Sequence, residues 1–131
     1  MLNEGRVYFG LFGDDFDPES LAIGVAPTKT ARKANPIPKQ SSWMYSSERV
    51  RGEVIDVYKM SASLVADLEP HIQNIREAMQ RHGLEAVLEV VLTITPDDSV
   101  STPILGFDQR VIAFLNDIGA TIDVDLYRGE S

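Results

Sequence analysis

The segment 86–95 restricts the fold more than any other part of the chain, because it has the clearest strand pattern. One face carries the apolar side chains Leu88, Val90, Leu92 and Ile94. The other face mixes valine and threonine with Glu89. Residues 120–127 repeat this alternation. Alternation of this kind is typical of strands in a sheet that is covered on one face only.

The remaining pattern predicts an α+β domain with a mixed, largely antiparallel sheet. We expect two longer helices packed on one face and one short helix after the first strand. Asp17-Pro18 has the form of a helix start, and Gly24 can end that short helix. Further strands are expected at 7–12, 42–47, 53–59 and 100–105, the second and third forming a hairpin around Gly52. A last helix is expected from Asp108 to Gly119.

Pro70 decides where the long helix is predicted to begin. Proline is tolerated in the first turn of a helix but clashes in its interior. Asp67 as N-cap places Pro70 at the third helical position, whereas Ser63 as N-cap places it deeper. The sequence therefore predicts a long helix that starts after Asp67 and ends at His82 and Gly83.

Composition limits the chemistry that the chain can perform. Its 131 residues include no cysteine and predict one domain over 1–131, with no disulfide and no cysteine nucleophile. The net charge of -8 argues against nucleic-acid binding and against adsorption to an anionic membrane. The N-terminus lacks the pattern of a signal peptide, which favours the cytoplasm. No motif indicates a cofactor.

A proline-rich basic segment interrupts this acidic chain at about 26–41. Three prolines oppose a regular element, so we expect an exposed loop. Between Ser20 and Ser47 there is no acidic residue, while four residues are basic: Lys29, Arg32, Lys33 and Lys39. Aromatic side chains follow at Trp43, Tyr45 and Tyr58, and in a hairpin they could share one face. Core packing is the default interpretation, and the alternative is a binding surface formed by these aromatic and basic residues together.

Two groups of aspartates could hold a cation or perform acid–base chemistry. Asp14, Asp15 and Asp17 superficially resemble a calcium loop but lack its glycine and distal glutamate, so helix capping is the simpler interpretation. Asp123 and Asp125 share one strand face, about 6.5–7 Å apart. Inverting glycosidases use such a spacing, but their catalytic carboxyl needs an apolar pocket. We expect this pair to keep a sheet edge soluble, and no metal site is predicted beyond the weak alternative at 14–17.

Several short motifs together resemble a known family. Phe9-Gly10 with Phe12, Asp17-Pro18, Pro27-Thr28 and Trp43 open the chain, and Ile118-Gly119 followed by Ile122-Asp123-Val124-Asp125 closes it. In these motifs the chain resembles the bacterial domain of unknown function family 4279 over about residues 6–128. The resemblance implies a small bacterial cytoplasmic protein. The family brings no assigned activity, and no site residue is carried over from it.

Two functions are compatible with these features. The first is a non-catalytic protein-interaction module, immunity-like or regulatory, with an unidentified protein partner and a surface that allows homo-oligomers. The alternative is a small-ligand-binding protein or hydrolase with a carboxylate-lined site that could hold a divalent cation. Nothing in the pattern requires an enzyme.

Overall fold

The computed structural model describes residues 2–130 and has the expected α+β architecture. In this described part of the chain, a six-stranded sheet is combined with three α-helices and two 3-10 turns. The strands are β1 (Asn3–Gly13), β2 (Lys29–Ala31), β3 (Ser41–Ser46), β4 (Val50–Gly52), β5 (Glu85–Ile94) and β6 (Thr121–Arg128). The helices are α1 (Val57–Leu68), α2 (Ile72–His82) and α3 (Gln109–Ile118), with 3-10 turns at Pro18–Ser20 and Glu69–His71.

The strand order of the sheet is β2-β3-β1-β5-β6, and β4 pairs with β1 beyond the end of β3. Every strand pair is antiparallel except β5 with β6. The parallel pair is connected by α3, as parallel neighbours require a crossover. Its register aligns Glu89 with Asp123 and Val91 with Asp125.

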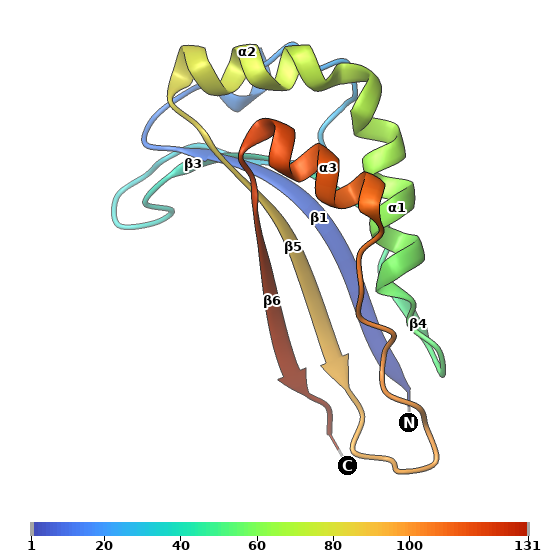
Figure 1. Cartoon of the computed structure of the whole chain (residues 1–131). Coiled ribbons are helices and arrows are strands. Elements are labelled where there is room, and N and C mark those ends of the chain that lie inside the picture. The colour runs from blue at the N-terminus through green and yellow to red at the C-terminus, as the bar shows by residue number, and fades with distance from the viewer. Residues whose placement is uncertain (1, 131) are drawn as a thin grey trace.

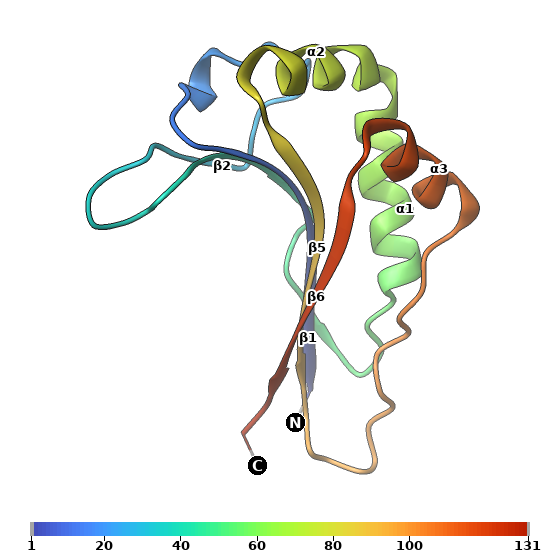
Figure 2. The ribbon, with the colours of Figure 1, turned by 60° about the vertical axis from the view of Figure 1, so that its left-hand side comes forward.

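Within residues 2–130, all three helices lie on one side of the sheet, and no helix covers the other side (Figures 1 and 2). The sheet bends strongly, and the uncovered side is the inner side of the bend (Figure 2). The core lies between the sheet and the helices, where the rings of Phe9 and Phe114 meet edge to face with centroids 5.9 Å apart. The covered face of the central strands contributes Val7, Phe9, Leu11, Leu88, Val90 and Leu92, each at most 1% exposed.

The long helical segment begins with α1, eleven residues earlier than the sequence predicts. Asp56, and not Asp67, is its N-cap, and the Asp56 carboxylate accepts a hydrogen bond from the Lys59 backbone N–H at 3.1 Å. Pro70 lies in the 3-10 turn between α1 and α2, where its missing N–H is tolerated. Residues 53–59 are therefore not a strand, because residues 53–55 are irregular and α1 begins at Val57.

We expect Asp56→Ala to lower the free energy of unfolding by about 1 kcal/mol, because it removes the only side-chain cap of α1. Chemical denaturation monitored by circular dichroism measures the change. Asp56→Asn is the matched control, since asparagine is an equally good N-cap. Equal losses in both variants would contradict a capping role.

The other predicted elements agree with the structure to different degrees. The Asp108 carboxylate caps α3 by accepting from the Val111 backbone N–H at 2.8 Å, and Gly119 ends the helix with φ 72°. The short helix after Asp17 is one 3-10 turn. The predicted hairpin of 42–47 with 53–59 is absent, since β3 pairs with β1 and β2. The predicted strand at 100–105 is reduced to a single bridge between Asp56 and Ile104.

Within the predicted loop at 26–41, residues 29–31 form β2, and residues 32–40 are exposed. This exposed hairpin loop extends away from the body of the molecule (Figure 1). Among residues 2–130, no helix has both the length and the apolar character that crossing a bilayer requires.

Candidate functional site

The uncovered face of the sheet carries the side chains that alternate with the core residues. Pairing between the strands arranges these side chains in rows across β1, β5 and β6. One row is Tyr8, Glu89 and Asp123, and the next row is Arg6, Val91 and Asp125. The register thus places residues that are far apart in the sequence side by side on an open surface.

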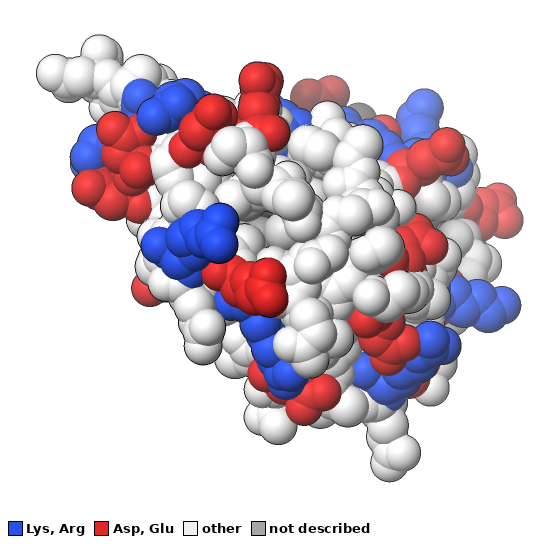
Figure 3. All heavy atoms as spheres, turned by 90° about the horizontal axis from the view of Figure 1, so that it is seen from above, with Lys and Arg blue, Asp and Glu red and all other residues white. Residues whose placement is uncertain are grey.

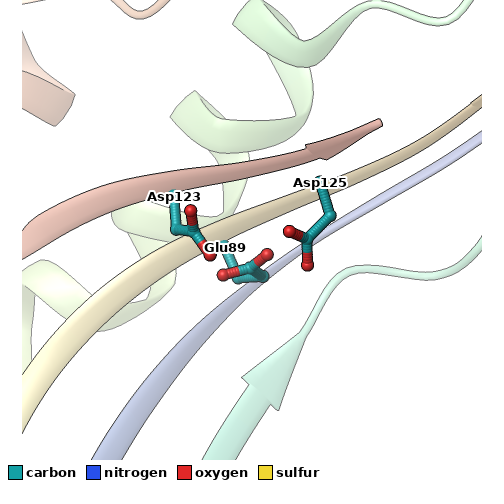
Figure 4. Close-up of side chains that lie close together, drawn as sticks. All are labelled: Glu89, Asp123 and Asp125. Atoms are coloured by element: carbon teal, nitrogen blue, oxygen red, sulfur yellow. The ribbon is translucent and has the colours of Figure 1, made fainter. Parts of the chain in front are cut away.

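Glu89, Asp123 and Asp125 converge on this face, and we call them the carboxylate triad. Each contributes an oxygen atom that lies within 4.8 Å of the other two. Glu89 lies between the two aspartates, and the three side chains point to the same side of the sheet (Figure 4). Glu89 is only 6% exposed, and its Oε1 atom has no hydrogen-bond partner among the described residues. Asp123, on the edge strand β6, is exposed.

The triad concentrates negative charge without a compensating cation. Two carboxylates within 4.8 Å of each other, in surroundings of intermediate polarity, repel each other by about 3 kcal/mol or more. No lysine or arginine among residues 2–130 forms an ion pair with any of the three. Burial, and then proton sharing with Asp125 and Asp123, raises the pKa of Glu89 to about 8. Without a bound cation, Glu89 therefore holds a proton at neutral pH.

Two β1 side chains border the triad. The Arg6 guanidinium lies over the Tyr8 ring, 5.0 Å from its centroid. Burial and the nearby Glu89 raise the pKa of Tyr8, and Arg6 acts in the opposite direction. The Tyr8 hydroxyl therefore stays neutral at physiological pH. Arg6 supplies the positive charge on β1 that lies nearest to the triad.

A family model described as a domain of unknown function (DUF4279) matches residues 3–129. The chain belongs to this family. The match extends over all six strands and confirms the resemblance seen in the sequence. No curated protein and no solved structure matches the chain.

In this DUF4279 chain the predicted alternative metal group, Asp14, Asp15 and Asp17, does not converge. The Lys33 Nζ donates to an Asp14 oxygen at 2.6 Å, and the Arg32 Nε donates to an Asp15 oxygen at 3.3 Å. Asp17 caps the first 3-10 turn. Basic and acidic side chains are likewise interspersed on the face seen from above (Figure 3). These aspartates form ion pairs with Arg32 and Lys33 of the basic loop.

The predicted aromatic and basic surface is not assembled in the DUF4279 structure. Trp43 is 1% exposed and belongs to the core, so it cannot contact a partner. The Tyr45 hydroxyl donates to an Asp67 oxygen at 2.8 Å, which links β3 to α1. Tyr58 is exposed, but it lies on α1 and not on a strand. Lys29 and Lys39 are exposed, on β2 and in the hairpin loop respectively.

The sequence identified two members of the triad and missed the third. Asp123 and Asp125 were expected on one face, and they are. The expectation that they keep a sheet edge soluble stays a prediction, but it did not include the buried Glu89, which parallel pairing brings against them. The signal for Glu89 was its position as the only charged residue within the apolar run 86–94.

Proposed function

We propose that this chain is a cation-binding protein, and that the carboxylate triad on its open sheet face holds one divalent cation. The observation that supports this proposal is the buried Glu89 carboxyl, which lies between Asp123 and Asp125 and has an Oε1 atom without a hydrogen-bond partner among the described residues. A buried ionised acid destabilises a fold unless a proton or a cation neutralises it. A cation would relieve both this burial and the mutual repulsion of the triad.

The oxygen atoms of the triad lie close enough together to bind one calcium ion. Calcium binds oxygen ligands at about 2.3–2.6 Å, so two ligands on opposite sides of the ion are at most about 5 Å apart. The limit of 4.8 Å within the triad fits this size. Magnesium demands near-ideal octahedral geometry and keeps several waters, whereas calcium takes six to eight oxygen ligands in flexible geometry and suits three adjoining carboxylates better. Since one side of the site faces solvent, water would complete the coordination.

The test is titration of the apo protein with CaCl2, MgCl2 and MnCl2, followed by calorimetry and thermal unfolding. At a calcium concentration one hundred times the dissociation constant, binding adds about 2.7 kcal/mol of stability. We therefore expect the melting temperature to rise by several degrees in wild type. Asp123→Asn/Asp125→Asn should remove the response, because amides carry no charge.

The matched control is Asp14→Asn/Asp15→Asn, which removes the same charge from the paired aspartates near the basic loop. This control should keep the full calcium response. A flat titration of wild type with all three ions, or an unchanged response in the Asp123/Asp125 variant, would contradict the proposal.

The second candidate function is a protein-interaction module in the bacterial cytoplasm. It is favoured by the outer edge of β6, which pairs with no strand among the described residues, and by exposed Leu126 and Tyr127 on that strand. A basic partner would be attracted to the triad in place of a metal ion. Stabilisation by a lysine-rich peptide, together with a flat metal titration, would favour this alternative.

A further inference from the structure

The open face is hollowed beside the carboxylate triad, around two arginines. The hollow has a volume of about 240 Å³, and its lining includes Glu4, Arg6, Arg49, Val91 and Tyr127. We call it the arginine hollow. Arg6, Val91 and Asp125 form one row across three strands, so the hollow and the triad adjoin each other on the sheet.

Arg6 differs from the arginines that stabilise the fold. Arg32 is paired with Asp15, Arg110 with Glu69, and Arg76 donates to the Asp117 carbonyl. Arg6 makes no hydrogen bond or ion pair through its side chain within residues 2–130, and its Nε atom is buried without a partner. A partly buried guanidinium that lacks an acceptor is costly, so its position suits an acceptor supplied from outside.

The geometry also fixes the orientation of the Arg6 side chain. Its contact with the Tyr8 ring holds the planar guanidinium on the open face, next to the hollow. A planar guanidinium matches the two oxygen atoms of a carboxylate or phosphate group. Arg49 adds a second positive charge to the same lining.

We infer that the arginine hollow binds the phosphate or carboxylate group of a small anionic ligand, which also coordinates the cation in the triad. This inference rests on the proposed function, since the cation completes the ligand site. Without a cation, the triad and Glu4 would repel an anion. With the cation bound, the anion meets positive charge from the metal on one side and from Arg6 and Arg49 on the other.

The two ligands should therefore bind cooperatively. The cation raises the affinity for the anion, and thermodynamic linkage requires the anion to raise the affinity for the cation by the same factor. Couplings of this kind are typically about 5- to 150-fold. Arg6→Gln should lower the affinity for the anion, because it removes the guanidinium that would bind it. The same variant should leave the affinity for calcium unchanged or raise it, because it removes a positive charge near the triad.

The experiment is isothermal calorimetry of wild type with methyl phosphate and with acetate, each with and without saturating CaCl2. We expect calcium to strengthen the binding of at least one anion about tenfold or more, and the preferred anion identifies phosphate or carboxylate chemistry. Arg6→Gln and Arg49→Gln should each weaken that binding. Arg81→Gln on α2 is the matched control, because α2 lies on the opposite side of the sheet from the hollow.

The outcomes separate the two proposals. Calcium binding without any detectable anion binding would overturn the arginine hollow and leave the cation site standing. Anion binding that is unaffected by calcium, or by both hollow variants, would also overturn the inference. Failure of calcium to bind at all would instead contradict the proposed function on which the inference depends.

Discussion

Trp43→Ala is expected to lower the free energy of unfolding by about 3–5 kcal/mol, the usual range for truncating a large aromatic side chain in a core. Trp43 is the largest fully buried side chain and is 1% exposed. It lies on β3, paired with Leu11 of the central strand and with Thr30 of β2. Its removal leaves a cavity where three strands meet the core. Urea denaturation monitored by far-UV circular dichroism measures the loss.

Tyr58→Ala is the control for this prediction, because Tyr58 was grouped with Trp43 as a candidate binding residue. Tyr58 is 46% exposed on α1, and its truncation should change the free energy of unfolding by no more than about 0.5 kcal/mol. Trp43→Phe should fall between the two variants. A Trp43→Ala protein as stable as Tyr58→Ala would contradict the placement of Trp43 in the core.

Much of the fold could be predicted because its signals are local. The start of α3 at Asp108, its end at Gly119 and the alternation within β5 and β6 depend on neighbouring residues only. The start of α1 was missed because Val54, Ile55 and Val57 are β-branched residues, which are typical of strands. Burial against the sheet overrides that preference, and the Asp56 cap begins a helix there.

The candidate site was harder to predict because it depends on strand order. Glu89 and Asp123 belong to different strands, with α3 between them in the sequence. Only the parallel register of β5 and β6 brings them together. The same applies to Trp43 and Tyr58, which a hairpin would have placed on one face, whereas the fold separates them into core and surface. Local patterns identify which side chains share a strand face, but not which strand lies beside it.

The pH dependence of stability should change most in Glu89→Gln. In the folded protein without a cation, the pKa of Glu89 is raised from 4.5 to about 8. Below pH 4.5 the carboxyl is protonated in both states, and its stabilising effect is fully present. Between pH 4.5 and about 8, only the folded state holds the proton, so wild type loses stability as the pH rises. Above that range both states are ionised and the loss is complete.

The size of this effect follows from the shift. One pKa unit corresponds to about 1.36 kcal/mol, so the change from 4.5 to about 8 limits the loss to about 5 kcal/mol. Solvent around the exposed Asp123 and movement of the side chains reduce it. We therefore expect Glu89→Gln to gain about 2 kcal/mol or more relative to wild type between pH 5 and pH 9, because glutamine has no proton to lose.

Urea denaturation of both proteins at several pH values, in EDTA, measures this difference. Titrating groups that do not interact with Glu89 contribute equally to both proteins and cancel, and the measured difference belongs to the triad as a unit. Glu85→Gln is the matched control, since Glu85 lies on the same face of β5 but is exposed, and its profile should run parallel to that of wild type. If the free energy of unfolding depends on pH in the same way in Glu89→Gln and in wild type, Glu89 is not confined beside two carboxylates. If calcium instead restores the stability of wild type at pH 9 and leaves Glu89→Gln unchanged, the same acid both destabilises the empty site and binds the ion.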